Sequence, residues 1–217
     1  MSNVAVVLSG CGVFDGAEIH ESVLTLLYLA RAGAQVRCFA PDKAQMHVID
    51  HMTGEAMAEQ RNVLVESARI ARGQIEPLAS LKVEEFDALV VPGGFGVAKN
   101  LSDFATAGSA CTVEPALLEV AQGFARQGKW ALYFCIAPAL LPRIYGAGVQ
   151  CTIGSDAATA AALAAMGGQH VTCGVTDVAV DEARRVISAP AYMLAASILE
   201  ADQSIALGVD ALMKRLA

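Results

Sequence analysis

The chain has 217 residues and a formal net charge of −7 at pH 7, with 15 Lys and Arg against 22 Asp and Glu. An acidic chain without a basic block binds nucleic-acid phosphates and anionic membranes poorly, and no apolar run reaches the ~18 residues of a membrane-spanning helix. Hydrophobic residues make up 55% of the chain, which allows a sizeable core and excludes intrinsic disorder.

The predicted elements alternate between strands and helices. Apolar β-branched runs predict strands, apolar residues three and four apart predict helices, and Gly or Pro ends most elements. In chain order, the sequence predicts a strand at 4–9, a helix at 18–32, a strand at 35–40, a helix at 61–72, a strand at 88–91, a helix at 114–127, a strand at 131–134, a helix at 157–166, a hairpin at 178–187 around Asp181-Glu182, and a mostly helical segment at 191–216.

This alternation predicts an α/β fold. Strands separated by helices form βαβ units, which give a mainly parallel sheet with helices on both faces. We expect one domain, 1–217, with an insert at 43–60 that covers the functional site and narrows access to it. Ligands bind beyond the carboxyl ends of parallel strands, so we expect the chemistry at 10–12, 92–96 and 135–138.

The N-terminus and the cysteines predict a cytoplasmic protein. The first residues contain no basic region of a signal peptide and lead directly into the first strand. The six cysteines form no CxxC pair, and an apolar chain of this size needs no disulfides, so we expect free thiols in a reducing compartment. The four histidines show no zinc-ligand spacing relative to the cysteines, so we expect no metal.

Cys135 is the most informative residue of the sequence. It follows the strand at 131–134 directly and precedes Ile136-Ala137-Pro138, which can open a helix. A strand, a sharp turn with a nucleophile and a helix together form a nucleophile elbow. The free N–H groups and partial positive charge of a helix N-terminus favour a thiolate there. A buried cysteine at a strand end is the alternative interpretation.

A glycine-rich turn follows the strand at 88–91. It reads Pro92-Gly93-Gly94-Phe95-Gly96, and glycines let backbone N–H groups face a ligand without a Cβ in the way. Two such amides can form an oxyanion hole, although a plain turn is the alternative. The turn has neither the GxxxxGK[ST] pattern of a phosphate loop nor the GxGxxG pattern of a dinucleotide fold, so we expect no cofactor.

These motifs together resemble the PfpI/ThiJ superfamily, which is related to class I glutamine amidotransferases. The resemblance is closer to its ElbB branch, whose members are described as sigma cross-reacting proteins or as enhancing lycopene biosynthesis. It implies a flavodoxin-like sandwich, a thiolate at Cys135 and a context in isoprenoid biosynthesis. The residues that carry it are 8–13, 15–21, 53–57, 61–64, 91–96, 98–101, 135–139 and 190–193.

The resemblance also implies a glutamate from the first helix beside the thiol. Counting back from Gly33 assigns this role to Glu21, and Glu18 is the competing carboxylate. The implied oxyanion and substrate-binding groups are the backbone N–H groups of Gly93, Gly94 and Ile136. Cys11 and Asn100 are further candidates for the site, and we expect Cys11 to lie near it without a catalytic role.

Two departures from the superfamily pattern narrow the expected chemistry. Amidotransferases complete a triad with a His-x-Glu after the nucleophile, but the corresponding region here reads Pro190-Ala191-Tyr192. Proteolytic members carry a histidine directly after the cysteine, where this chain has Ile136. Without a base held by a third group, attack on an amide lacks the proton that its leaving amine needs, so glutaminase and protease activities are disfavoured.

Thiolate addition to an aldehyde needs no such leaving group. We therefore expect a glutathione-independent glyoxalase that converts glyoxal or methylglyoxal to a 2-hydroxy acid through a hemithioacetal on Cys135, with Glu21 as base and acid. The expected ligand is a small aldehyde, and we expect no nucleic acid or membrane partner. The alternative is a non-enzymatic redox sensor or interaction protein that uses an exposed, easily oxidised Cys135.

The first helix predicts a homodimer. Its apolar stripe of Ile19, Val23 and Leu27, with Leu26 and Ala30, is expected to face the core. Leu24 and Tyr28 lie on the opposite side, as Glu21 does, and we expect both at a contact with a second copy.

The ionisation of the thiol and the carboxyl is expected to be coupled. The helix N-terminus and nearby amides should lower the pKa of Cys135, and a raised pKa of Glu21 should let its protonated carboxyl donate a hydrogen bond to the sulfur.

Overall fold

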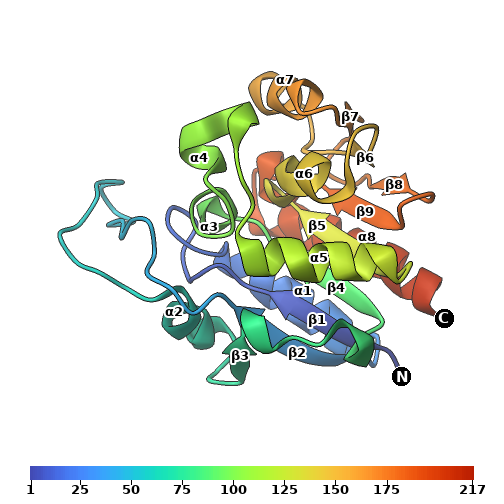
Figure 1. Cartoon of the computed structure of the whole chain (residues 1–217), viewed down its shortest axis with the longest axis horizontal. Helices are drawn as coiled ribbons and strands as arrows, with labels where there is room; N and C mark the ends of the chain where they lie inside the picture. Colours follow the sequence, from blue (N-terminus) through green and yellow to red (C-terminus); the bar gives the residue numbers. More distant parts are fainter.

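The structure, a computed structural model, describes all residues from 1 to 217 and contains one large sheet of seven strands (Figure 1). The strand order is β3-β2-β1-β4-β5-β9-β8, and every neighbouring pair is parallel except β8 and β9, which are antiparallel. Strands β6 and β7 pair in parallel as a small separate sheet. The strands are β1 (Asn3–Val7), β2 (Gln35–Ala40), β3 (Ile75–Pro77), β4 (Ala88–Val91), β5 (Trp130–Phe134), β6 (Gln150–Cys151), β7 (Gln169–His170), β8 (Ala179–Asp181) and β9 (Val186–Ala189).

Both α-helices and short 3₁₀ helices connect the strands. None of them combines the length and the apolar character that a membrane crossing requires. The α-helices are α1 (Ile19–Arg31), α2 (Val63–Ile70), α3 (Phe95–Lys99), α4 (Phe104–Ala107), α5 (Pro115–Arg126), α6 (Leu141–Tyr145), α7 (Ala157–Ala165) and α8 (Ile198–Leu216). The 3₁₀ helices are η1 (Leu78–Ser80), η2 (Val83–Glu85), η3 (Gly108–Ala110), η4 (Ala137–Leu140) and η5 (Ala191–Met193).

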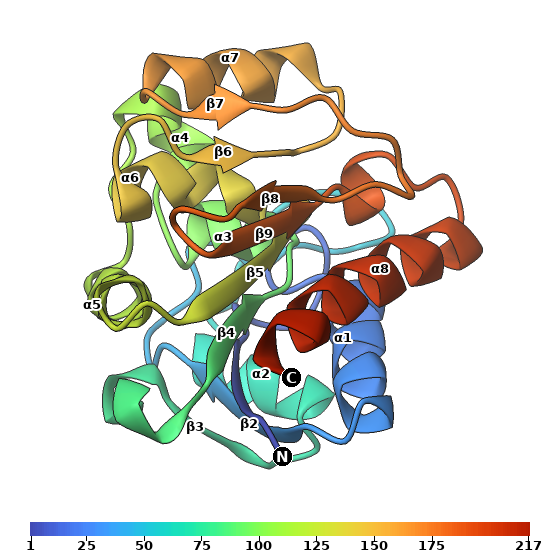
Figure 2. The ribbon, with the colours of Figure 1, turned by 90° about the vertical axis from the view of Figure 1, so that its right-hand side faces the viewer.

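Helices cover both faces of the large sheet, which confirms the predicted flavodoxin-like α/β fold. Figure 2 shows α5 and α6 on one side of the sheet and α1 and α8 on the other, and the two hydrophobic core clusters lie between these layers. In β1, Val4 and Val6 pack into one cluster, whereas Ala5 and Val7 pack into the other. A strand covered on both faces is apolar at every position, which explains the continuous apolar runs of the sequence.

The predicted elements occur in the predicted order, and β8 and β9 form the expected hairpin. The sequence did not indicate β3, β6, β7, α3 or α4. These elements have two to five residues each, and such short segments cannot display the periodicity that reveals a helix or a strand.

Helix α1 presents a different face to the sheet from the one predicted. Most of the stripe expected in the core is exposed, with Ile19 at 43%, Val23 at 47% and Leu27 at 41%, whereas Leu26 is half-buried and packs against a core cluster. Ser22 lies on the buried face, and its hydroxyl donates to the Glu18 carbonyl within the helix, so a polar side chain is tolerated there. The buried side chains of α1 are Glu21, Ser22, Thr25 and Leu29.

The opposite side of α1 contacts α8 of the same chain. Leu24 and Tyr28 pack against the core cluster to which α8 contributes, and the Tyr28 hydroxyl donates to Asp202 Oδ1 at 2.7 Å. Helix α8 thus covers part of this side of α1, where both residues are half-buried, and their contact with a second copy stays a prediction.

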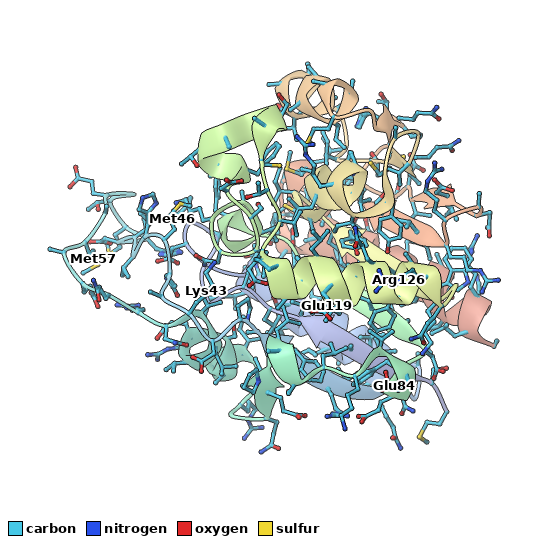
Figure 3. All side chains as sticks on the ribbon, in the orientation of Figure 1. Lys43, Met46, Met57, Glu84, Glu119 and Arg126 are labelled. Carbon is cyan, nitrogen blue, oxygen red and sulfur yellow. The ribbon has the colours of Figure 1, made fainter.

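The predicted insert at 43–60 belongs to a projecting segment, residues 43–62, which we call the arm (Figure 1). Two antiparallel bridges hold its two sides together, and residues 51–60 are all exposed. Figure 3 shows Met57 far from the sheet. No residue of the arm lines the cavity at the strand ends, so the prediction that the insert covers the site is wrong.

Candidate active site

A cavity of about 620 Å³ lies at the carboxyl ends of β4 and β5. The residues that follow these strands, Gly94, Cys135 and Ile136, line it together with residues from the start of α1, from α3 and α4, from the first turn of α7 and from η5. Most of its lining residues are apolar, as is typical of small-molecule sites. Parallel α/β sheets bind ligands at this edge.

Cys135 occupies a nucleophile elbow. Its backbone has φ of 59°, and its N–H donates to the Ala189 carbonyl of β9 at 3.0 Å. Positive φ in a residue other than glycine costs about 1–3 kcal/mol and persists where surrounding structure enforces it, often at functional sites. Cys135 is 8% exposed and lies between the end of β5 and the start of η4. The backbone therefore has the strand–turn–helix geometry that the sequence predicts.

Glu21 reaches the same place from the first turn of α1. It is fully buried, and a backbone N–H group holds each carboxylate oxygen. The Gly93 N–H donates to Oε2 at 2.8 Å, and the Tyr192 N–H donates to Oε1 at 3.1 Å. A buried carboxylate is tolerated because its oxygens are hydrogen-bonded in this way. The helical wheel placed Glu21 on the side opposite the predicted core stripe, whereas the turn between β4 and α3 and the 3₁₀ helix η5 enclose its carboxylate.

Glycine is required at 93 because the thiol and the carboxylate converge there. A Cβ on Gly93 would lie 2.4 Å from Cys135 Cβ and 2.7 Å from Glu21 Oε2, which is closer than atoms can approach. The Gly93 N–H serves Glu21, so this residue positions the carboxylate and is not an oxyanion donor as predicted. The Glu21 carboxylate and the Cys135 sulfur thus lie close together beside Gly93, which has no side chain to separate them.

The amides of Gly94 and Ile136 both donate toward the Cys135 sulfur, which lowers the pKa of the thiol in part. Gly94 has φ of 96°, and a Cβ there would lie 2.4 Å from the Glu18 nitrogen. These two N–H groups follow the neighbouring strands β4 and β5, and both lie beside the sulfur that would attack a substrate. They are the groups that the sequence analysis proposed for the oxyanion.

Burial dominates the ionisation of the pair. Burial raises the pKa of Glu21 to about 7, against the lowering effect of its hydrogen bonds, and this confirms the predicted direction. Burial, with the negative charge of Glu21, also raises the pKa of the Cys135 thiol well above its usual value. The predicted lowering is wrong, because it counted the helix N-terminus and the amides but not the loss of solvent. Glu21 is therefore placed to accept the thiol proton when the sulfur attacks.

Three other predicted residues have different positions. Glu18 lines the cavity and caps α1, where its Oε2 accepts the Glu21 N–H at 2.7 Å. Asn100 is fully buried and does not line the cavity. Cys11 does not line it either, and the charges nearest its thiol are those of Glu66 and Arg69 on α2. Cys11 therefore lies outside the cavity, although its backbone nitrogen is next to Gly16, which in turn packs against Gly94.

The cavity also contains residues that the sequence did not single out. Lys99 Nζ donates to the Phe14 carbonyl at 2.7 Å and lies 5.5 Å from the ring centroid of Phe95. Tyr192 lines the cavity from η5, and its hydroxyl lies 2.8 Å from Nδ1 of His20. Lys99 and Tyr192 fall within the blocks 98–101 and 190–193 of the resemblance, and this was their only signal.

The chain was compared with known proteins, and no protein-family model matches it. The ES1 protein homolog, mitochondrial, of Rattus norvegicus is 48% identical over 202 residues, which are 88% of this chain and 76% of the rat protein. The human glutamine amidotransferase-like class 1 domain-containing protein 3, mitochondrial, is 46% identical over 202 residues, which are 88% of this chain and 75% of the human protein. Both names say mitochondrial, which contradicts the predicted cytoplasmic location.

Solved structures show the same fold. The isoprenoid biosynthesis protein with amidotransferase-like domain from Ehrlichia chaffeensis matches with a TM-score of 0.94 and 38% identity over the whole of both chains. Glyoxalase III from Candida albicans matches with a TM-score of 0.65 over 98% of this chain and 96% of that chain. Its sequence identity is 11%, so this second likeness concerns the fold alone.

Proposed function

We propose a glyoxalase function for this chain. The chain belongs to the ES1 family of glutamine amidotransferase-like class 1 domain proteins, within the PfpI/ThiJ superfamily. The proposed reaction converts a 2-oxoaldehyde to a 2-hydroxy acid without glutathione. One observation carries it: Glu21, a fully buried glutamate whose pKa burial raises to about 7, is hydrogen-bonded to the elbow cysteine that lines the cavity, and two backbone N–H groups donate to the same sulfur. This set supplies a nucleophile, a base and an oxyanion site.

The first stage is addition to the aldehyde. The Cys135 sulfur bonds to the aldehyde carbon, C1, while Glu21 accepts the thiol proton and the N–H groups of Gly94 and Ile136 stabilise the oxygen O1. Glu21 then returns this proton to O1, which gives a hemithioacetal and restores the carboxylate. No amine leaves in this stage, so the absent histidine after the cysteine is not required.

The second stage moves a hydrogen between the two carbons. The Glu21 carboxylate removes the proton from C1, which gives an enediolate, and then delivers it to the neighbouring carbon C2. Once the hydroxyl proton has also moved from O1 to O2, the product is a thioester of Cys135. Water cleaves the thioester, releases the 2-hydroxy acid and restores the thiol, so the overall change is the addition of one water to the substrate.

The size of the cavity suggests a substrate larger than methylglyoxal, which has five non-hydrogen atoms. A volume of about 620 Å³ falls among sites of roughly 300–1,000 Å³ that enclose much larger ligands. We therefore propose 2-oxoaldehydes whose C2 carries an aryl group or an alkyl group larger than methyl as the preferred class.

Purified protein assayed with glyoxal, methylglyoxal and phenylglyoxal tests this function, with the hydroxy acid measured directly. We expect turnover without glutathione, a higher kcat/KM for phenylglyoxal than for methylglyoxal, and no turnover for Cys135→Ser. Consumption of all three substrates at the same rate by the wild type and Cys135→Ser would exclude the proposed function.

The redox-sensor alternative receives less support from the geometry. It needs an exposed thiol that ionises easily, whereas Cys135 is 8% exposed and burial raises its pKa. The Ehrlichia relative is described as an isoprenoid biosynthesis protein. We extend that metabolic context to this chain as a proposal, based on their 38% identity.

A further inference from the structure

The proposed reaction needs one proton transfer that Cys135 and Glu21 do not supply. After Glu21 has carried the hydrogen from C1 to C2, O1 still holds the hydroxyl proton of the hemithioacetal, and O2 is the atom that needs a proton. The thioester forms only when O1 loses its proton and O2 gains one. Glu21 carries the carbon-bound hydrogen during this stage, and a second group beside the cavity would let the two oxygens exchange their proton in the same step.

Tyr192 is placed to serve them. It lines the cavity together with Cys135, and its backbone N–H holds Oε1 of Glu21 at 3.1 Å. Its hydroxyl is paired with Nδ1 of His20 at 2.8 Å, and the two rings lie 5.8 Å apart between centroids. Tyr192 is half-buried and His20 is exposed, so the pair connects the cavity with solvent.

The charges around the hydroxyl favour its protonated form. Burial raises the pKa of Tyr192, and the negative charges of Glu18 and Glu21 raise it further. The titratable groups that face this tyrosine are therefore Glu18, Glu21 and His20, with Cys135 on the same cavity wall. When His20 donates its Nδ1 proton to the phenol oxygen, the phenol proton is free to point to the substrate.

We propose that Tyr192 is a catalytic residue that moves a proton between the two substrate oxygens, and that His20 is a positioning residue that orients its hydroxyl. This inference rests on the proposed function. In the step itself, the O–H bond of Tyr192 breaks as its proton bonds to O2. The phenolate then takes the proton from O1 as the C1=O bond of the thioester forms, so Tyr192 ends as it began and no other reactant is needed.

Tyr192→Phe tests the role of the hydroxyl because it leaves the ring and the backbone N–H to Glu21 in place. General acid–base groups contribute about 10²–10⁴-fold, so we expect kcat for methylglyoxal to fall by about 10²-fold with KM nearly unchanged. Tyr28→Phe is the matched control, since it also removes a hydroxyl hydrogen bond but lies outside the cavity. We expect it to keep wild-type kcat.

Alkylation of Cys135 by iodoacetamide, followed at that peptide by mass spectrometry, separates a proton-transfer role from a disturbed site. We expect the same alkylation rate in Tyr192→Phe and in the wild type, because the thiol and Glu21 keep their contacts. A loss of turnover with an equally slowed alkylation would assign the effect to the thiol and overturn the proposal.

The contribution of His20 is tested by chemical rescue. His20→Ala should lose at least about tenfold in kcat, and added imidazole should restore part of it, because the empty position is at the surface. His47→Ala, an exposed histidine of the arm, should have no effect with or without imidazole. A loss that imidazole does not restore would overturn the role of His20.

The same assays distinguish a failure of the proposed glyoxalase function from a failure of the role proposed for Tyr192. A wild-type protein without turnover overturns the proposed function and the inference that depends on it. A wild-type protein with turnover that Cys135→Ser abolishes and Tyr192→Phe retains overturns only the inference.

Discussion

At the scale of single residues, Glu21 couples the stability of the fold to the chemistry of the site. Its carboxyl is fully buried, and burial raises its pKa from 4.5 to about 7. Water solvates the same carboxylate in the unfolded chain, so the shift exists in the folded state only. Between these two values the folded chain holds a proton that the unfolded chain has released, and stability therefore falls as the pH rises. The ionisation that costs stability also produces the base of the proposed reaction.

We predict that raising the pH lowers the free energy of unfolding of the wild type by about 3 kcal/mol through Glu21 alone, since one pKa unit corresponds to about 1.4 kcal/mol. The fall should occur between pH 4.5 and about 7, the two pKa values of this carboxyl. Glu21→Gln cannot ionise and should lack this contribution. Urea denaturation at a series of pH values measures the difference in slope between the two proteins.

The exposed Glu84 provides the control for this pH dependence. Glu84→Gln should keep the wild-type slope, because water solvates this carboxylate in both states. Identical slopes for the wild type and Glu21→Gln would show that the burial of Glu21 does not raise its pKa.

At the scale of elements, the arm and the loop after β1 are held as one unit by Asn100. Its Nδ2 donates to the carbonyls of Ser9 and Asp15 at 2.8 Å, and its Oδ1 accepts the Met46 N–H at 3.0 Å. The Ile49 N–H of the arm donates to Asp15 Oδ2 at 2.8 Å. The arm therefore supports the loop that precedes α1 and Glu21, although it does not line the cavity.

We predict that Asn100→Ala destabilises the protein by at least about 2 kcal/mol, because each buried polar group left without its partner costs about 1–3 kcal/mol. Amide hydrogen exchange should become faster at residues 9–16 and in the arm by a larger factor than in the central strand β5, whose amides follow global stability only. Met57→Ala, at an exposed position of the arm, should leave both stability and exchange unchanged. Wild-type exchange rates in Asn100→Ala would contradict this role.

At the scale of the whole molecule, the outer face of α1 is the candidate contact for a homodimer. Ile19, Val23 and Leu27 lie on this face, each more than 40% exposed, beside the buried face that carries Glu21. An apolar stripe that the fold leaves uncovered indicates an interaction surface. We propose a second copy of the chain as its partner, on a face of α1 that α8 does not cover.

Size-exclusion chromatography with light scattering tests this assembly. We expect a mass of twice 22.5 kDa for the wild type and a monomer for the double variant Val23→Asp, Leu27→Asp, because two buried carboxylates without partners oppose association. Val65→Asp, at an exposed apolar position on α2, should remain dimeric. A monomeric wild type at micromolar concentration would remove the argument.

The amino-acid sequence alone determined the order of the main strands and helices, the parallel α/β class and the elbow at Cys135. These features follow from local properties of the chain, namely apolar periodicity and glycines or prolines at the ends of elements. The glycine-rich turn at 92–96 was found in the same way, because glycines, which have no side chain, can be read directly from the sequence. The assignment of Glu21 came from the resemblance to a family and not from these patterns.

Only the tertiary structure decided which face of α1 is buried, how Glu21 ionises and which histidine contacts Tyr192 at the cavity. The wheel of α1 displays an apolar stripe, but α8 and the sheet enclose the helix from other directions and leave that stripe exposed. His20 and Tyr192 are 172 positions apart and meet only because η5 folds back onto the start of α1. The burial and the pKa of a side chain such as Glu21 depend on all of these distant contacts together, and a local sequence pattern contains no information about them.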